Sequence, residues 1–410
     1  MTTPLLIILI GFLIFLGHYL AQVFDRTKVP DVVGLLLVGM LLGPVFHLID
    51  PAAFGRGGRV FSNLVLVFIL FESGLEVRFE QLRLALRGTI GLTSLNFVVT
   101  TLVVAVMGHL FAGLDVLSAI ILGTILGGTS SAVVTTLVRK VNILEQTSTT
   151  LVMESALSDV FTLAIPIALI SFYTGSSFNL ITLFSQIISS LIVALLAGVG
   201  GGYLWSALQN QVPMVLKTRF STPAFVFILY GLVEMLNFSG PIAVLFFSIT
   251  LANITLLRPR VLRNYFPTHH VELTATEKDF FAEIVFLLRT FFFVFVGMSI
   301  VLDNGYLIAL GVGMAAVLFL VRIPVVRATA GRHTPGFDMA IMSIMIPKGL
   351  GAAVLATLPA QRGIPSGPAI QTLTFSVIMA TTVLCTVLFF LVERRRILGF
   401  YALFFGRSRP

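Results

Sequence analysis

The sequence predicts an all-α membrane protein that crosses the bilayer many times, and composition and hydropathy are the observations that predict it. Of the residues, 57% are hydrophobic and only 11% are charged, and the mean hydropathy is +1.04. Apolar windows of about 20 residues, the helix length that crosses roughly 30 Å of hydrocarbon, recur along the whole chain. The connectors between them are short, so a single membrane domain over 1–410 is expected, without a soluble domain.

Thirteen spans are predicted along the chain. The first lacks a basic leader, so it is interpreted as a helix and not as a cleaved signal peptide. The spans are 5–23, 31–48, 61–77, 89–112, 116–138, 148–173, 178–208, 222–237, 240–257, 280–302, 305–328, 337–358 and 368–393.

The loop charges predict that the N-terminus lies outside and the C-terminus in the cytoplasm, because cytoplasmic loops retain Lys and Arg during insertion. The loops assigned to the outside carry only Arg56, Arg59 and Arg362. The inside loops carry Arg26, Lys28, Arg78, Arg83, Arg87, Arg139, Lys140, Lys217, Arg219, Arg258, Arg260, Arg263, Lys278, Arg327, Arg332, Arg394, Arg395, Arg396, Arg407 and Arg409. These anchors face anionic membrane lipid and explain the net charge of +8, which disfavours a nucleic-acid partner.

Two acidic residues inside the sixth span are the first candidate functional residues. On a helix, residues four apart share a face and residues five apart diverge by about 140°. Ser155, Asp159 and Thr162 therefore line one stripe, which suits cation coordination by oxygen, while Glu154 and Ser158 form a second pair turned away from it. The two carboxylates are accordingly expected to have different roles. Glu72, Glu76 and Glu234 are further acidic candidates, for which structural roles are favoured.

Three basic residues also fall inside spans: Arg289, Arg322 and Lys348. Each costs roughly 2.5–3.5 kcal/mol at the membrane centre unless it faces a partner or water. Glu154 is expected to face a fixed cation such as Arg322, and a purely structural ion pair remains open for it. Snorkelling to the headgroups remains an alternative for Arg322 and Lys348.

Two spans contain helix-weakening sequences at corresponding places of the chain. "GGTSS" (127–131) interrupts the fifth span and "IPKGLGAA" (346–353) the twelfth. If spans one to six and eight to thirteen are inverted-topology repeats, these interruptions correspond, as in secondary transporters whose site lies between two broken helices. Close helix packing through small residues is the alternative for the first of them.

Enzyme chemistry has no support in the sequence, because no nucleophile–base arrangement and no metal-ligand spacing is visible. Cys385 is the only cysteine, which disfavours a Cys-ligated metal, and no cofactor is expected. Besides cation transport, an inverted-repeat carrier for a small organic anion remains open if Lys348 and Arg322 dominate the site. A cation channel is a further, weaker alternative.

Six segments together resemble the monovalent cation/proton antiporters, the sodium/hydrogen exchanger superfamily with its potassium-efflux branch. They are "VPDVVGLLLVGMLLGP" (29–44), "LFESGLEVRF" (70–79), "GGTSSAVV" (127–134), "ESALSD" (154–159), "RTFFFVFVG" (289–297) and "PKGLGAAVLA" (347–356). The resemblance implies a homodimer in a prokaryotic cell membrane that exchanges Na+ or K+ for H+ by an elevator-like movement. It implies a dimerisation part (1–88 and 209–302), a mobile core (89–174 and 303–395) and a linker helix (178–208).

The resemblance also implies roles for individual residues. Asp159 would alternately bind the cation and the proton, with Thr129 and Ser155 as further cation ligands. Ser130, Ser158 and Glu154 complete the candidate ion- and proton-binding set. Glu154 would pair with Arg322, while Lys348 and Arg289 organise the core.

Three departures from the family pattern limit this transfer. Ser158-Asp159 stands where sodium/proton exchangers usually have Asn-Asp or Asp-Asp, which suggests electroneutral exchange through a single aspartate. Thr-Ser-Ser at 129–131 replaces the Thr-Asp-Pro of many sodium exchangers, so Na+ and K+ both remain open. The fourth span contains no carboxylate for Arg289, whose partner is therefore left unassigned.

Overall fold

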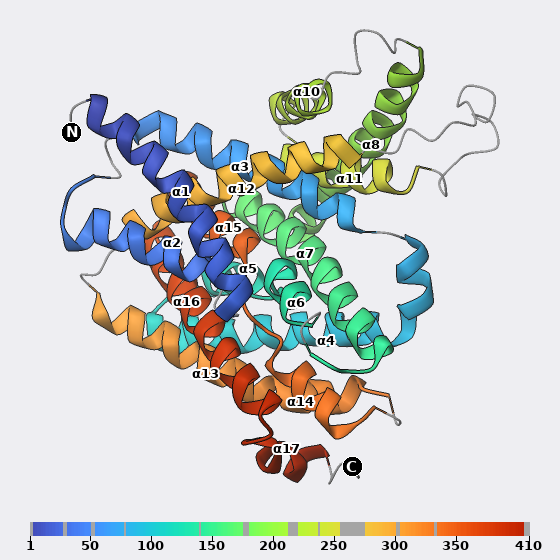
Figure 1. Ribbon diagram of the computed structural model, residues 1–410. Helices are drawn as coiled ribbons and strands as arrows, with labels where there is room; N and C mark the ends of the chain where they lie inside the picture. The colour runs from blue at the N-terminus through green and yellow to red at the C-terminus, as the bar shows by residue number, and fades with distance from the viewer. Residues whose placement is uncertain are drawn as a thin grey trace.

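The structure is a computed structural model, and its described residues form helices joined by turns, without a strand among them (Figure 1). The described residues are 3–27, 31–50, 54–77, 79–138, 141–174, 180–211, 220–236, 238–254, 275–300, 304–331 and 334–405. Each of the predicted spans contains helix, although the number of membrane crossings remains a prediction.

The helices pack in two groups. In the first, α12 packs against α1, α2 and α3, and α11 packs against α3, α8 and α10. Its elements are α1 (Thr3–Thr27), α2 (Asp31–Met40) with a π-helical turn η1 (Leu41–Val45), α3 (Gly55–Glu76), α8 (Leu180–Gln211), α10 (Ser221–Met235), α11 (Gly240–Ala252) and α12 (Ala275–Met298).

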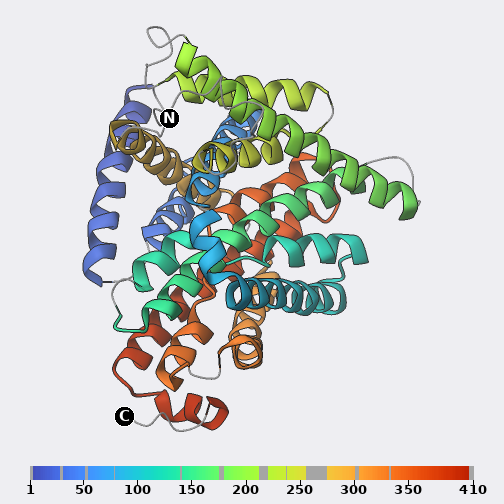
Figure 2. The ribbon, with the colours of Figure 1, turned by 90° about the vertical axis from the view of Figure 1, so that its right-hand side faces the viewer.

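In the second group, α4 packs against α5, α7 and α13, and α16 packs against α13 and α15. Its elements are α4 (Phe79–Ala112), α5 (Val116–Ile125), α6 (Ser131–Val138), α7 (Glu145–Tyr173), α13 (Gly305–Thr329), α14 (Gly336–Ile344), α15 (Leu350–Gln361), α16 (Gly367–Glu393) and α17 (Leu398–Phe405). Figures 1 and 2 both place α8, α10 and α11 at one end of the molecule and α14 and α17 at the other.

The fifth and twelfth predicted spans are each divided into two helices. α5 ends at Ile125 and α6 begins at Ser131, while α14 ends at Ile344 and α15 begins at Leu350. The intervening residues, 126–130 and 345–349, are not helical and are almost entirely buried. Backbone groups freed at these breaks need partners inside the protein, because hydrocarbon offers none.

The crossing of α2 and α12 brings two backbones into direct contact. A Cβ atom on Gly39 would lie 2.2 Å from the carbonyl oxygen of Val294, and one on Gly297 would lie 2.3 Å from that of Leu36. Both distances are far below van der Waals contact, so only glycine fits at either position. We call this contact the glycine seam.

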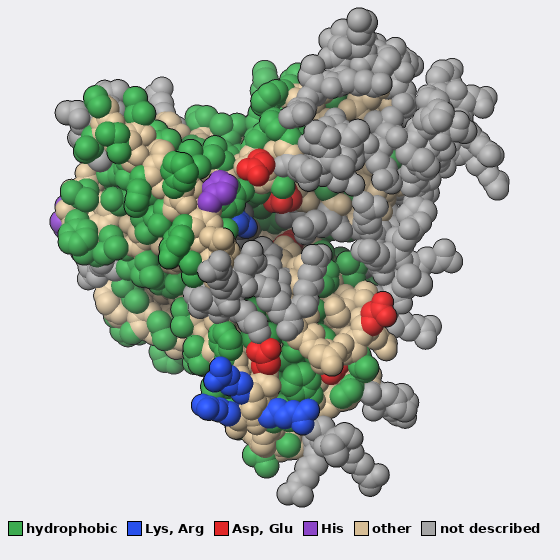
Figure 3. Space-filling model, viewed as in Figure 1, with side chains coloured by type: hydrophobic (Ala, Val, Ile, Leu, Met, Phe, Trp, Pro, Cys, Tyr) green, Lys and Arg blue, Asp and Glu red, His purple; other side chains and the backbone are tan. Residues whose placement is uncertain are grey.

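The surface of the protein is strongly apolar. Six helices of the described part are long and apolar enough to cross a membrane, and shorter apolar helices accompany them. On α1, for example, Ile8 is 67% exposed and Phe15 is 80% exposed. Hydrophobic side chains accordingly dominate the upper left of the face in Figure 3, whereas Lys and Arg side chains gather toward its lower end. Such a surface is suited to lipid and not to water.

The basic residues that predict the topology are only partly placed. Arg394, Arg395 and Arg396 follow α16 and are exposed. Lys28, Arg78, Arg139, Lys140, Lys217, Arg219, Arg258, Arg260, Arg263, Arg332, Arg407 and Arg409 lie outside the described residues. The orientation of the termini across the membrane therefore stays a prediction.

Candidate functional site

Helix α7 carries both acidic candidates at the centre of the second group. Glu154, Ser155 and Ser158 are buried, with at most 1% of each side chain exposed, whereas Asp159 is only half-buried. This difference follows from helical geometry, since Glu154 and Asp159 are five residues apart and point in different directions. The two acids therefore lie in different environments on one helix.

Glu154 forms a two-pronged ion pair with Arg322 of α13. Arg322 Nη1 donates to Glu154 Oε1 at 2.5 Å and Nη2 donates to Oε2 at 2.6 Å, while Nε donates to the Met342 carbonyl at 3.2 Å. Both side chains are 1% exposed. This planar fork is the strongest geometry available to a carboxylate and an arginine. The contact expected between Glu154 and Arg322 is therefore present. Because the Arg322 side chain is buried, it does not snorkel to the headgroups in this structure.

Ser158 links α7 to the break between α5 and α6. The Ser158 hydroxyl donates to the Ser155 carbonyl at 2.9 Å, and it accepts from the Thr129 amide at 3.1 Å. The Thr129 hydroxyl lies 3.3 Å from the same oxygen and can donate to it. The Ser155 hydroxyl donates to the Val152 carbonyl at 2.8 Å. Three of the predicted site residues, Thr129, Ser155 and Ser158, are thus brought together by hydrogen bonds.

A buried hydroxyl beside this link has no hydrogen-bond partner among the described residues. It belongs to Thr162, which is 3% exposed and lies one turn beyond Ser158 on α7. A Cβ atom on Gly128 would lie 2.2 Å from this hydroxyl oxygen, so the break approaches it closely only because residue 128 is glycine. A buried, unbonded oxygen is costly unless it binds something, which makes Thr162 a candidate ligand.

The two helix breaks are bonded to each other. The Ser130 amide donates to the Pro347 carbonyl at 2.7 Å, and Lys348 Nζ donates to the Gly128 carbonyl at 2.9 Å. Lys348 is only 2% exposed, so it is held inside the protein and does not snorkel. Its ammonium binds the Gly128 carbonyl just beyond the C-terminal end of α5, where a helix carries partial negative charge. Lys348 therefore joins the breaks at the same place where Thr129 meets α7.

Arg289 lies in the other group of helices. Its Nη2 donates to Asp31 Oδ2 of α2 at 2.7 Å, and its guanidinium lies 5.9 Å from the centre of the Phe286 ring. Asp31 is thus the partner of Arg289 that the fourth predicted span does not supply. Asp31 escaped notice because it directly precedes an apolar run, where an acidic residue is expected at a helix start. The structure does not bring this pair into the hydrogen bonds around Thr129 and Ser158.

A second buried acid also escaped sequence reasoning. Asp338, in the first turn of α14, is 4% exposed and accepts a hydrogen bond from the Leu144 amide, just before α7, at 3.0 Å. It ties the start of α7 to α14. No group of three or more His, Cys, Asp and Glu side chains suited to a metal ion occurs among the described residues.

Two interrupted membrane helices that meet beside an acidic helix define a class of protein, the secondary transporters. The particular family follows from comparison with known proteins. A model of the family described as "Sodium/hydrogen exchanger, transmembrane" matches residues 11–394. The chain belongs to this family, whose members are ion transporters and not enzymes, and it is an integral membrane protein.

Two relatives with assigned activities are antiporters. The chain is 25% identical to the K+/H+ antiporter NhaP of Alkalimonas amylolytica over 379 residues, which cover 88% of this chain and 61% of the relative. It is 21% identical to the Na+/H+ antiporter 1 of Methanocaldococcus jannaschii, with 85% of this chain and 81% of that protein covered. The chain thus spans less than two thirds of the length of the first of these relatives.

A solved structure has the same fold. The sodium proton antiporter MjNhaP1 from Methanocaldococcus jannaschii at pH 8 superposes with a TM-score of 0.74, covering 99% of this chain and 100% of that chain at 20% identity. At this identity the likeness establishes the fold.

Proposed function

We propose that this protein exchanges Na+ or K+ for H+ across a prokaryotic cell membrane, with Asp159 as the shared binding site for cation and proton. The observation that carries the proposal is the contact of the two helix breaks beside α7, through the Ser130–Pro347 and Lys348–Gly128 hydrogen bonds. Freed backbone carbonyls and hydroxyls at such a place provide oxygen ligands for a monovalent cation.

The division of labour between the two acids supports Asp159 as the transport residue. Both oxygens of Glu154 accept from Arg322, so Glu154 is held as a structural anion. Asp159 is half-buried on another face of α7, on the helical stripe that also contains Ser155 and Thr162. Burial disfavours a bare carboxylate and a bound cation favours it, so a proton and a cation compete for Asp159.

Hydroxyl groups at the break complete the proposed cation site. Thr129 and Ser155 are proposed as ligands together with Asp159, and Ser130 and Ser158 as the residues that position them. The unbonded Thr162 hydroxyl adds a further oxygen. Hard monovalent cations prefer such oxygen ligands.

Exchange is proposed to be electroneutral, with one cation for one proton. The charge of Glu154 is balanced by Arg322, and a single further carboxylate, Asp159, is proposed to alternate between cation and proton. A carrier for an organic anion is disfavoured, because the buried cations that it would need, Arg322 and Lys348, already donate to Glu154 and to the Gly128 carbonyl.

The movement is proposed to be elevator-like. The second group of helices, with both breaks and α7, corresponds to the mobile core, and the first group to the dimerisation part of a homodimer, with α8 as the linker. Packing within each group is more extensive than packing between the groups, which supports this division.

The first prediction concerns Asp159. In proteoliposomes with an imposed pH gradient, addition of Na+, K+ or Li+ in turn is expected to dissipate the gradient for at least one cation. Asp159→Asn is expected to reduce exchange to the level of empty liposomes, because an amide neither carries the charge nor binds the proton. Asp115→Asn, a matched change at the N-cap of α5 and outside the proposed site, should retain wild-type rates. Exchange by a folded Asp159→Asn variant at wild-type rates contradicts the proposal.

A further inference from the structure

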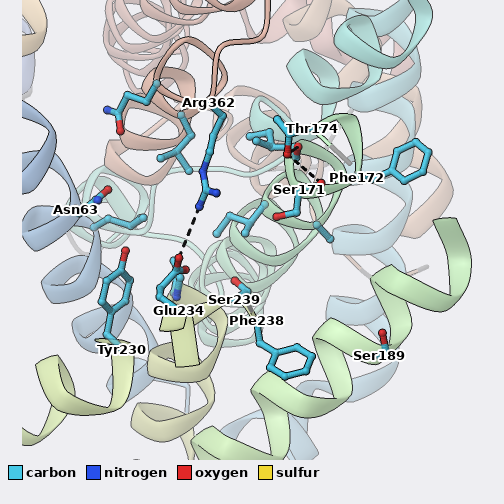
Figure 4. Close-up of a pocket in the computed structure, with 17 residues that line it drawn as sticks. Asn63, Ser171, Phe172, Thr174, Ser189, Tyr230, Glu234, Phe238, Ser239 and Arg362 are labelled. Carbon is cyan, nitrogen blue, oxygen red and sulfur yellow. Dashed lines mark hydrogen bonds and ion pairs between the residues drawn. The ribbon is translucent and has the colours of Figure 1, made fainter. Parts of the chain in front are cut away.

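A cavity of about 560 Å³ lies between the two groups of helices (Figure 4). One wall comes from the first group and includes Asn63 of α3, with Tyr230 and Glu234 of α10. The opposite wall comes from the second group, from the last turns of α7 and from the end of α15 with Arg362. In the predicted topology this is the outer side of the protein, because α7 and α15 both end there.

Glu234 is held in place by the start of α11. Its Oε1 accepts a hydrogen bond from the Gly240 amide at 3.1 Å, at a helix N-terminus that favours negative charge. A Cβ atom on Gly240 would lie 2.8 Å from Glu234 Cγ, so this close approach requires glycine. The carboxylate is therefore anchored within the first group.

Arg362 reaches Glu234 from the other wall of the cavity. Arg362 directly follows α15, and its Nη2 lies 3.7 Å from Glu234 Oε2, with 54% and 30% of the two side chains exposed. In Figure 4 the two side chains point toward each other, joined by the dashed line. The pair is single-pronged and partly exposed, so it forms and breaks at little cost.

The Glu234–Arg362 pair connects the two groups of helices, whereas the two other ion pairs described above each lie within one group. Glu154–Arg322 joins α7 to α13, within the second group, and Asp31–Arg289 joins α2 to α12, within the first. Glu234–Arg362 joins α10 of the first group to α15 of the second. It is thus placed where relative movement of the groups would separate its partners.

We propose that Glu234 and Arg362 are positioning residues of the transport cycle, forming a reversible latch that holds the two groups in the arrangement seen here. The inference rests on the proposed exchange function and names a site outside the ion-binding residues. A sliding movement of a few Å breaks the pair, so the latch stabilises one arrangement and not the other. Because the pair is weak, it slows departure from that arrangement without preventing it.

Cross-linking tests whether the latch must open. Cys385 is the only cysteine and is buried, so introduced cysteines are the accessible ones. The variant Glu234→Cys/Arg362→Cys is treated with a short bifunctional methanethiosulfonate in proteoliposomes. We expect exchange to stop on cross-linking and to return with dithiothreitol. Undiminished exchange by the cross-linked protein overturns the latch.

A matched pair within one group controls for the reagent. Ser366 Oγ lies 3.3 Å from Asp115 Oδ1, and both residues belong to the second group. Asp115→Cys/Ser366→Cys, cross-linked in the same way, is expected to retain exchange. If the wild-type protein exchanges no cation, the proposed function fails and the latch falls with it. If the wild type exchanges and the cross-linked Glu234/Arg362 variant does too, only the latch fails.

Charge removal tests the latch without a cross-link. Glu234→Gln keeps an oxygen that accepts from the Gly240 amide, and Arg362→Gln removes the partner cation. Each single variant, and the double variant equally, is expected to raise the exchange rate at saturating cation about two- to fivefold. Additive effects, a lowered rate or an unchanged rate in all three variants contradict the proposal. If Glu234 and Arg362 only stabilise the fold, the variants should unfold at a lower temperature, where the buried Cys385 becomes accessible to a thiol dye. Their exchange rate should then stay unchanged.

Discussion

Two Glu–Arg pairs in this protein have the same chemistry and opposite settings. Glu154–Arg322 is two-pronged, 2.5–2.6 Å long and 1% exposed on each side, inside one group of helices. Glu234–Arg362 is single-pronged and 3.7 Å long, with 30% and 54% of the two side chains exposed, and it crosses a cavity between groups. Desolvation makes the first pair expensive to break, whereas water competes for the second at every moment. Burial, and not residue type, therefore sets the cost of breaking each pair.

The largest expected effect comes from breaking the buried pair on one side. Arg322→Met leaves the Glu154 carboxylate buried without its partner, which should lower the free energy of unfolding by about 3–5 kcal/mol. Thermal unfolding can be followed in detergent by the reaction of Cys385 with a thiol dye, since this thiol is buried until the protein opens.

The double variant Glu154→Gln/Arg322→Met sharpens this test. It removes both charges together, so it should recover most of the stability that Arg322→Met loses. A single variant as stable as the wild type would show that the buried pair is no more costly to break than the exposed one, and the comparison would fail.

An intermediate effect is expected for the pair that lies between these extremes. Asp31 is 5% exposed and Arg289 is 24% exposed, and one contact of 2.7 Å joins them. Asp31→Asn should therefore destabilise the protein by about 1.5–3 kcal/mol, the contribution of a hydrogen bond to a charged group. The same Cys385 assay measures it, and a loss larger than that of Arg322→Met would reverse the predicted order.

The smallest effect is expected at Asp115, the N-cap of α5, where the carboxylate accepts from the Ser118 amide at 3.0 Å. Asp115→Ala should cost about 0.5–2 kcal/mol, while Asp115→Asn keeps the cap. Burial raises the pKa of this carboxyl, but hydrogen bonds from Ser118 and Ser366 outweigh burial and leave the pKa below its ordinary value of 3.8.

The sign of the pH dependence at Asp115 follows from this lowered pKa. The charged form is favoured in the folded protein, so its contribution is present above pH 3.8 and is lost as the pH falls through the lower folded-state pKa. Melting temperatures of the wild type and of Asp115→Asn should therefore converge in acid. A gap that widens on acidification would contradict the assignment.

The helices and both interruptions were predictable from the sequence, because membrane helices follow from local hydropathy and breaks from local glycine, proline and hydroxyl content. Residues 126–130 and 345–349 fall inside the predicted fifth and twelfth spans, as expected. The separation of Glu154 from Asp159 also followed from local geometry, since it depends only on the rise and turn of one helix.

Contacts between distant segments were predictable only where charge demanded a partner. Glu154 and Arg322 are opposite charges inside apolar spans, where each needs a partner, so their contact could be expected from the sequence. Asp31 gave no such signal, and its contact with Arg289 depends on how α2 crosses α12. The hydrogen bond from Lys348 to the Gly128 carbonyl could not be predicted for a different reason. Every residue has a carbonyl group, and the sequence does not indicate which carbonyl a helix break leaves without an intrahelical partner.

The glycine seam between α2 and α12 offers a fixed reference for measuring the proposed movement. Each glycine lies against the backbone of the opposite helix, so a shift of either helix along the other would drive main-chain atoms into collision. We therefore expect α2 and α12 to move together as one rigid unit. A pair of spectroscopic probes, one on this unit and one on α15, would report the proposed motion of the second group directly, without a contribution from bending within the first group.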